Sequence, residues 1–290
     1  MHADEIETDV ALVRRLLSGQ FPEWADLALE PVLTSGTVNA LYRLGDDLVV
    51  RLPRNRGSRS GDLEREFRWL PALSPLVPVA VPEPLAKGAP GEGYPWEWGV
   101  YRWLDGENPT PGHASDSLAE ELARFVLTLH RVELADGPPS GRGASLGAFD
   151  EATRAAIAAL EGEIDAEAAT AAWEEALATP EWPHPPVWAH GDLMPGNLLM
   201  RDCRLAAVID WGAVGIGDPA CDLMVAWNLL PADARPVFRA ALGYDDATWA
   251  RGRGWALWTG LVGLPYYRVT NPGFAAKARR TVGEILAEIG

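Results

Sequence analysis

Residues 187–223 read VWAHGDLMPGNLLMRDCRLAAVIDWGAVGIGDPACDL. Short apolar runs alternate here with turns that carry acidic side chains. The first run ends at Ala189, and the turn residues His190 and Gly191 then place Asp192 at the end of a predicted strand. Asp192 is therefore the first candidate for a functional carboxylate in this segment.

The next two apolar runs predict a hairpin. Residues 197–200 and 205–209 are separated by Arg-Asp-Cys-Arg, which is enough for a tight turn. The hairpin brings Asn197, at the start of one strand, near Asp210, at the end of the other. An amide and a carboxylate are hard oxygen ligands, suited to Mg²⁺ and poorly suited to zinc. Asp192 stays free of this pair and can orient or deprotonate a hydroxyl nucleophile.

A metal pair and a nearby base are the groups that phosphoryl transfer needs. The alternative is a set of turn-forming Asp and Asn residues that only cap helices and hairpins.

Asp-Leu-x-x-x-Asn is also the protein-kinase catalytic-loop pattern, and Asp210-Trp211-Gly212 stands where those enzymes have Asp-Phe-Gly. The residue after His190 is Gly rather than Arg, and no Ala-Pro-Glu element follows. The chain departs from protein kinases at these two points, and there it resembles the aminoglycoside phosphotransferase family and its relatives, the choline, homoserine and fructosamine kinases. It shares with them the motifs Ile-Asp-Trp and Gly-Asp-Pro-x-x-Asp-Leu.

This resemblance implies an α+β, bilobal, protein-kinase-like fold. A small β-rich nucleotide-binding lobe would cover residues 1–104, and a larger, mainly helical lobe for catalysis and acceptor binding would cover 105–290. The implied cofactors are ATP or GTP with Mg²⁺, and the implied partner is a small-molecule acceptor, first an aminoglycoside, with a role in antibiotic resistance. A macrolide, choline-like alcohol, homoserine or sugar amine stays open as acceptor, as does a non-catalytic nucleotide-binding module. His190, Asp218 and Asp222 would support the catalytic loop.

The N-terminal lobe holds the candidate phosphate-binding residues. Ser35, Gly36 and Thr37 form a small-residue turn between two strands, a geometry that lays backbone N–H groups over phosphates; a plain hairpin is the alternative. By resemblance, Arg51 stands where kinases carry a strand Lys, and Glu66 matches its helix partner. Arg is a planar fork and Lys a point charge, so the two are not equivalent. Arg51 could also be a solvated strand residue.

The remaining candidates also come from the resemblance. Tyr101, Trp103 and Leu104 belong to the hinge between the lobes, whose backbone holds the nucleotide base. Residues that could form the acceptor site are Asp245, Asp246, Trp255, Trp258, Tyr266, Tyr267 and Arg268. Carboxylates suit the ammonium groups of an aminoglycoside, and aromatic rings suit a choline-like cation. Surface acids and core aromatics are the alternative for each residue.

Composition narrows the class of protein. The net charge of −16 argues against a nucleic-acid partner, which would need a basic face, and favours a cationic small molecule. There is no apolar run of membrane-spanning length and no charged-then-apolar leader, so we expect a cytoplasmic protein without a membrane partner. Cys203 and Cys221 are too few for a disulfide framework. The oligomeric state cannot be read from the sequence.

Apolar periodicity predicts the other elements. A helix over residues 9–17 would be capped by Thr8 and stopped by Gly19. His130, at the end of a helix, is interpreted as a core or capping group. The glycines of the 141–147 loop follow no strand, which excludes a dinucleotide site. Further helices are expected at 61–73, 115–130, 152–177, 223–230, 236–242, 248–267 and 275–289, and strands at 38–44, 48–52, 83–87 and 96–104.

Overall fold

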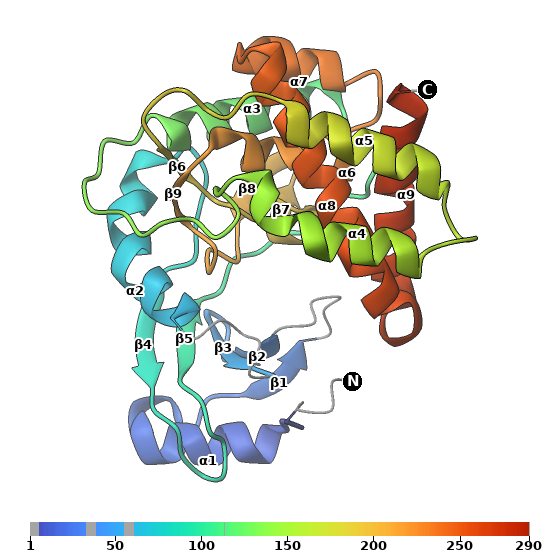
Figure 1. The fold of residues 1–290 in the computed structure, drawn as a ribbon. Coiled ribbons are helices and arrows are strands. Elements are labelled where there is room, and N and C mark those ends of the chain that lie inside the picture. Colours follow the sequence, from blue (N-terminus) through green and yellow to red (C-terminus); the bar gives the residue numbers. More distant parts are fainter. Residues whose placement is uncertain (1–5, 33–38, 55–60, 113, 290) are drawn as a thin grey trace.

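A five-stranded antiparallel sheet forms the smaller of the two parts of the molecule (Figure 1). The computed structural model describes residues 6–32, 39–54, 61–112 and 114–289. The sheet order is β1-β2-β3-β5-β4, with β1 (Leu29–Val32), β2 (Asn39–Leu44), β3 (Leu48–Pro53), β4 (Pro84–Gly88) and β5 (Trp98–Arg102). Ser35, Gly36 and Thr37, the expected phosphate-binding turn, lie outside the described residues.

One face of this sheet packs against α1 (Val10–Gln20). The predicted cap and stop were wrong: the side chain of Asp9 accepts the Leu12 N–H at 2.7 Å, and the helix continues through Gly19. Thr8 instead accepts a hydrogen bond from the Tyr42 hydroxyl. The resulting core is made by residues of α1 and of the strands, and by Tyr94 from the connection between β4 and β5; its members are Leu12, Val13, Leu16, Leu17, Leu29, Ala40, Tyr42, Leu44, Leu48, Val50, Leu52, Tyr94, Trp98 and Val100.

The larger part is mainly helical, which confirms the α+β class. Its helices are α3 (Asp116–His130), α4 (Asp150–Ala159), α5 (Ala166–Ala178), α6 (Val225–Asn228), α7 (Arg235–Leu242), α8 (Asp246–Thr270) and α9 (Pro272–Ile289). Helix α2 (Asp62–Leu73) lies between the sheet and this part (Figure 1). Its Leu70 and Leu73 belong to the core of the larger part. None of the described helices is long and apolar enough to cross a membrane.

The single helix predicted over residues 152–177 is wrong, because the chain forms two helices there. Helix α4 ends before Gly162, which has φ = 81° and breaks the helical path. Asp165 then caps α5 by accepting the Ala168 N–H at 3.0 Å. The helix predicted over 223–230 also begins differently, as a 3₁₀ segment over Pro219–Met224 that leads into α6.

Two small antiparallel pairs carry the segment 187–223. Strands β7 (Leu198–Arg201) and β8 (Arg204–Val208) form the expected hairpin, and Asp202 and Cys203 at its turn both have positive φ, as a tight two-residue turn requires. Strand β6 (Val187–Ala189) pairs with β9 (Gly215–Gly217).

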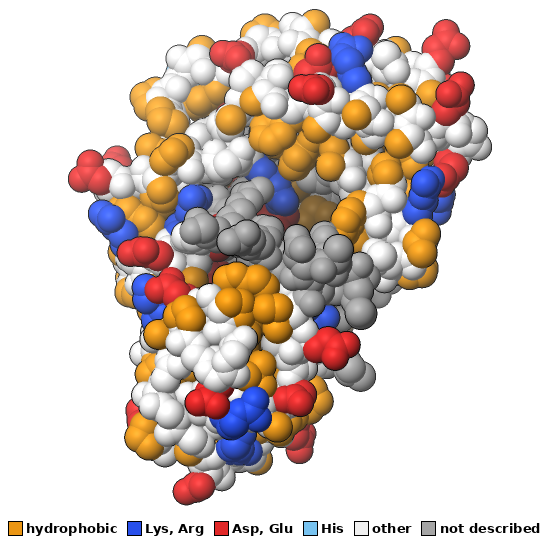
Figure 2. Space-filling model, turned by 60° about the horizontal axis from the view of Figure 1, so that its bottom comes forward, with side chains coloured by type: hydrophobic (Ala, Val, Ile, Leu, Met, Phe, Trp, Pro, Cys, Tyr) orange, Lys and Arg blue, Asp and Glu red, His pale blue; other side chains and the backbone are white. Residues whose placement is uncertain are grey.

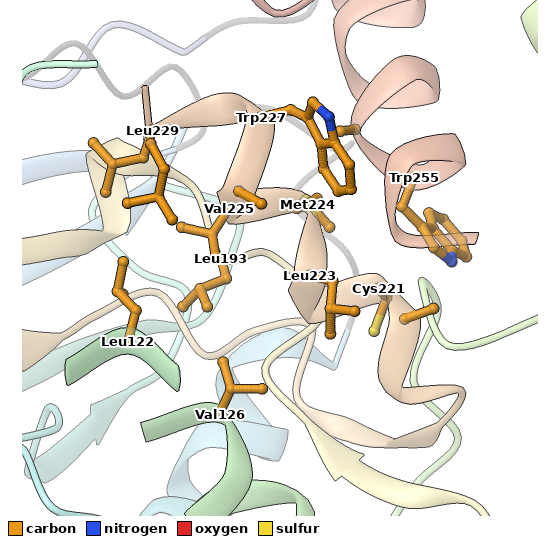
Figure 3. Close-up of a cluster of buried hydrophobic side chains, with 14 of the residues drawn as sticks. Leu122, Val126, Leu193, Cys221, Leu223, Met224, Val225, Trp227, Leu229 and Trp255 are labelled. Atoms are coloured by element: carbon orange, nitrogen blue, oxygen red, sulfur yellow. The ribbon is translucent and has the colours of Figure 1, made fainter. Parts of the chain in front are cut away.

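Leu193, the residue after Asp192, is fully buried and anchors this segment in the larger core. Figure 3 shows its side chain among Leu122 and Val126 of α3 and Val225 and Leu229. Burying a leucine side chain contributes about 1.5–3 kcal/mol, so the position of the neighbouring Asp192 backbone is fixed by packing.

The contact between α8 and the Pro219–Met224 segment generates a stability prediction. A Cβ added at Gly252 would lie 2.6 Å from the Leu223 Cβ, whereas one added at Gly283 in α9 meets nothing within 4 Å. We expect Gly252→Ala to lower the free energy of unfolding by about 1–3 kcal/mol through overpacking. Gly283→Ala, the matched control, should raise it by about 0.5–1 kcal/mol through helix propensity. Urea unfolding of both variants tests this, and equal effects would contradict the described packing.

Candidate active site

The buried carboxylate of Glu66 joins the two parts of the molecule. It lies on α2, has 0 % exposure, and accepts hydrogen bonds from three separate elements. Arg51 Nη1 of β3 donates to its Oε1 at 2.8 Å, and the Trp211 backbone N–H donates to the same oxygen at 2.9 Å. The Tyr101 hydroxyl of β5 donates to its Oε2 at 2.7 Å. The predicted Arg51–Glu66 pair is therefore present, and Arg51 is only slightly exposed rather than solvated.

Arg51 also reaches the predicted metal ligand Asp210, with Nη2 3.4 Å from Oδ1. A guanidinium can contact both carboxylates at once because it presents several donors in one plane. Burial alone would lower the pKa of Arg51, but the charges of Glu66 and Asp210, with Tyr101, outweigh burial and raise that pKa. The cation is therefore permanent. Burial, and then the Glu66 charge, raise the pKa of Tyr101 well above its ordinary value, so its hydroxyl remains a donor.

Asp210, which comes after β8, has φ = 61°. This left-handed backbone conformation is uncommon for residues other than glycine, and such residues are concentrated at functional sites. Withdrawal from water raises its pKa above the usual value; Arg51 opposes this shift, and Glu66 and Asp192 add to it. Since 38 % of its side-chain surface stays exposed, solvent screens part of the effect. Figure 2 looks into a hollow between the two parts of the molecule, where charged side chains are visible.

Asn197 lies beside this carboxylate because its carbonyl accepts the Ile209 N–H at 2.8 Å. Its side-chain Nδ2 donates to the Asp192 carbonyl at 2.8 Å. Among the described residues, no hydrogen bond engages its Oδ1. The fold therefore brings Asn197, Asp192 and Asp210 together, with an amide oxygen left available as a ligand.

His190 connects Asp192 to the strand before Asp210. Its buried ring accepts the Asp192 N–H on Nδ1 at 3.2 Å, so Nε2 must carry the proton that it donates to the Ile209 carbonyl at 3.1 Å. The ring also packs edge-on against Trp211 at 4.8 Å. This geometry suits the supporting role predicted for His190.

Asp222, also fully buried, holds the backbone at His190 and Gly191. Its two oxygens accept the His190 N–H at 2.9 Å and the Gly191 N–H at 2.8 Å. His130 Nε2 lies 3.2 Å from Oδ2, and His130 Nδ1 lies 2.8 Å from the Tyr244 hydroxyl. His130 is thus a satisfied core group, as interpreted from the sequence. Burial acts to raise the pKa of Asp222, but the hydrogen bond and charge of His130 and the Gly191 N–H together lower it.

Asp218 makes its side-chain contacts with the segment that follows it and with α8. It caps the 3₁₀ segment by accepting the Ala220 N–H at 2.9 Å. Arg251 of α8 binds both of its oxygens, with Nε at 2.6 Å and Nη2 at 3.2 Å. The contact ties Asp218 to α8.

The sequence-based reasoning missed Arg142, which contacts the predicted base. Its Nη1 donates to Asp192 Oδ1 and, at 3.1 Å, to the Gly191 carbonyl. The guanidinium also lies over the Trp258 ring, with Cζ 5.5 Å from the ring centroid. No local pattern could have revealed this, since Arg142 and Asp192 are 50 residues apart.

The expected hinge residues have mixed surroundings. Strand β5 ends at Arg102, so Trp103 and Leu104 begin the connection to the larger part. The Trp103 N–H is already bonded to the Asp47 carbonyl at 2.7 Å, and its ring lies 4.0 Å from the Arg43 guanidinium. The Trp103 N–H is therefore not free for a nucleotide base. Tyr101 acts through its hydroxyl, as described above.

The expected acceptor residues do not gather in one place. Asp245 caps α8, and the hydroxyl and N–H of Thr248 lower its pKa, while Asp246 pairs with Arg239 at 2.5 Å. Tyr266 lies 20 residues after Asp246 on the same helix, which corresponds to about 30 Å at ~1.5 Å per residue. One small-molecule site cannot contain both ends.

Of the remaining acceptor candidates, Tyr267 packs on Phe274 and Arg268 pairs with Glu163 at 2.7 Å, both near the second end of α8. Trp255 is fully buried. Trp258, through its contact with Arg142, is the acceptor candidate that the structure connects to Asp192.

Comparison with known proteins gives one consistent group. The model of the phosphotransferase enzyme family matches residues 31–255. The aminoglycoside 3′-phosphotransferase of Streptomyces fradiae is 29% identical over 203 residues, which are 66% of this chain and 72% of that protein. The GDP and kanamycin complex of APH(2″)-IIIa has a TM-score of 0.73 at 20% identity, covering 95% of this chain and 98% of the other. Macrolide 2′-phosphotransferase MphH from Brachybacterium faecium has a TM-score of 0.60 at 27% identity, covering 93% and 97%.

The Asp222 contacts predict a large, pH-dependent loss of stability. Asp222→Asn should lower the free energy of unfolding by about 3–5 kcal/mol, because it removes a buried charge that several donors surround. Because the pKa of Asp222 is lower in the folded state than in the unfolded state, its ionised carboxylate stabilises the fold at pH values above the unfolded-state pKa of about 3.9. This stabilisation is lost as the pH falls through the folded-state pKa. The difference from wild type should therefore be constant from about pH 8 to 5 and narrow below about pH 4.

Urea unfolding across this pH range measures the difference. Asp233→Asn, which changes an exposed carboxylate, is the matched control and should have little effect. A difference that widens on acidification would show that Asp222 is not ionised in the fold.

Proposed function

This chain belongs to the phosphotransferase enzyme family, and from that premise we propose that it transfers the γ-phosphoryl group of ATP or GTP to a hydroxyl of a small molecule. The observation that supports this most strongly is the convergence of Asp192, Asn197 and Asp210 beside the Arg51–Glu66 pair. These groups come from both parts of the molecule, so their meeting is a property of the fold rather than of the local sequence.

The donor set fits Mg²⁺ with a nucleotide. Asn197 and Asp210 offer an amide and a carboxylate oxygen, and Mg²⁺ typically takes one or two such ligands together with phosphates and water. Within the described ranges, no three His, Cys, Asp or Glu side chains form a cluster that could hold a metal ion. Mg²⁺, when bound, neutralises charge on the phosphates. Arg51, fixed by Glu66, would bind phosphate oxygens directly.

Asp192 would act on the acceptor. Its carboxylate is one quarter exposed and lies on a loop held by Asp222, His190 and buried Leu193. In phosphoryl transfer a carboxylate at this place accepts the proton of the attacking hydroxyl and aligns its oxygen. The complete Asp192, Asn197 and Asp210 set argues against a module that only binds nucleotides.

We propose an aminoglycoside-type acceptor first. The named relative from Streptomyces fradiae is an aminoglycoside phosphotransferase, and the net charge of −16 favours a cationic ligand. A macrolide is the second candidate, because the macrolide phosphotransferase MphH is 27% identical to the chain over 93% of its length.

Acceptor-dependent release of ADP or GDP tests the function. We expect nucleotide turnover with Mg²⁺ to rise when one acceptor class is added from a panel of aminoglycosides, macrolides, choline, homoserine and sugar amines. Mass spectrometry of the acceptor should show the added phosphate. No transfer to any acceptor of the panel would contradict the proposed small-molecule kinase.

Asp192→Asn should lower kcat by about 10²–10⁴-fold, since it removes the proton acceptor but preserves the side-chain shape. The nucleotide dissociation constant, measured by calorimetry, should stay within about twofold, because Asp192 is not assigned to the nucleotide. An unchanged kcat would show that Asp192 is not the base.

Asp210→Ala should weaken nucleotide binding in Mg²⁺ and leave binding in EDTA nearly unchanged, because only the metal-dependent part of the affinity is lost. Calorimetric titrations with and without Mg²⁺ measure both. If nucleotide affinity fell equally with Mg²⁺ and with EDTA, Asp210 would maintain the structure of the site and would not be a metal ligand.

A further inference from the structure

Arg142 and Asp192 form an ion pair that no function described so far uses. Arg142 Nη1 binds Asp192 Oδ1 and also the Gly191 carbonyl, at 3.1 Å. One guanidinium therefore holds both the side chain and the backbone of the catalytic loop. Both partners are largely buried, with 19 % and 25 % of their side-chain surfaces exposed.

The loop that carries Arg142 is fixed on β9. The Ser140 N–H donates to the Ile216 carbonyl at 2.9 Å, and the Ile216 N–H donates to the Pro138 carbonyl at 2.8 Å. The Asp218 N–H donates to the Gly143 carbonyl at 2.9 Å. A Cβ on Gly143 would lie only 2.8 Å from the Gly217 Cα, so the two backbones pack in direct contact. This close packing sets the position from which Arg142 extends.

The same loop explains why position 191 is glycine. Gly191 has φ = 75°, and a Cβ there would lie 2.9 Å from Ser140 Oγ and 3.1 Å from the Ala213 carbonyl oxygen. The protein-kinase pattern has Arg at this position. Here the space beside the catalytic Asp is filled by residues 140–142, which bring a guanidinium from another part of the chain.

Arg142 is held there although its own hydrogen bonding is incomplete. Its Nε is buried and has no hydrogen-bond partner among the described residues. Leaving a buried donor unpaired costs free energy, about 1–3 kcal/mol. The Trp258 ring lies against the guanidinium, with the ring centroid 5.5 Å from Cζ, which is within the range of a cation–π contact.

We propose that Arg142 is a positioning residue for the phosphoryl transfer: by occupying Asp192 Oδ1, it turns Oδ2 toward the acceptor hydroxyl. No hydrogen bond within the described part of the chain engages Asp192 Oδ2. One oxygen of the carboxylate then binds Arg142, and the other is held in a fixed orientation for the acceptor hydroxyl. Misplacing a catalytic group by about 1 Å can lower the rate ~10²-fold, which is the size of effect that this ion pair can control. The inference rests on the proposed function.

The test compares Arg142→Met, which keeps an unbranched apolar side chain, with Arg142→Lys, which restores a cation. Arg154→Met is the matched control, because Arg154 also forms an ion pair with an Asp, Asp150 at 2.8 Å on α4, outside the site. Steady-state kinetics gives kcat and the acceptor KM, and calorimetry gives the nucleotide dissociation constant. Hydrolysis of ATP without acceptor is measured in parallel, together with Asp192→Asn.

We expect Arg142→Met to lower kcat by about 10–10²-fold, with the acceptor KM and the nucleotide dissociation constant within about twofold of wild type. Arg142→Lys should recover part of kcat, and added guanidinium ion should partly rescue Arg142→Ala. If Arg142 only stabilised the fold, kcat would not fall selectively while the acceptor KM stays unchanged, and guanidinium ion would not rescue the activity. Arg154→Met should behave like wild type.

Other outcomes overturn the proposal and stay distinct from failure of the proposed function. If wild type transfers phosphate and Arg142→Met has equal or higher kcat, Arg142 does not position Asp192, while the function stands. If wild type uses no acceptor but its ATP hydrolysis falls equally in Arg142→Met and Asp192→Asn, the positioning role holds and the acceptor assignment fails. Hydrolysis that is independent of Arg142 overturns the positioning role.

Discussion

The structure depends on the burial of one carboxylate, Glu66, between the sheet and the helical part. A buried carboxylate is strongly unfavourable unless donors surround it, and here Arg51, Tyr101 and the Trp211 backbone N–H satisfy it from three elements. Moving the two parts relative to each other would remove at least one of these donors. The electrostatic cost of the buried charge therefore fixes the relative position of β3, α2 and Asp210.

Asp222 plays the same physical part on the other side of the catalytic loop. It accepts two consecutive backbone N–H groups and contacts His130, again with no exposure to solvent. Glu66 orders the side of the site that we propose for the nucleotide, and Asp222 orders the backbone of the loop that carries Asp192. Between them, Asp192 and Asp210 keep part of their surfaces exposed for substrates. The two structural carboxylates are thus buried and fully hydrogen-bonded, while the predicted base Asp192 and the predicted metal ligand Asp210 are partly exposed.

Sequence-based reasoning worked where function depends on residues that are close along the chain. The hairpin that brings Asn197 to Asp210 is local, and the pair of Arg51 with Glu66 was expected from the family resemblance. It failed where a helical pattern hid a break, as at Gly162, and where contacts join distant segments, as for Arg142. It also grouped Asp245 with Tyr266, which lie at opposite ends of α8, although the helix expected over residues 248–267 already separated them.

By itself the sequence determined the family and the α+β class and singled out the candidate residues Asp192, Asn197 and Asp210, because side-chain types at short fixed spacings specify which ligands and protons they can hold. Only the tertiary structure decided that the Tyr101 hydroxyl satisfies Glu66, that Ser140 packs against Gly191 and that Arg142 binds Asp192. These contacts depend on how backbones pack at close range and on where a buried charge finds its donors. Both are properties of the folded chain, and no local pattern encodes them.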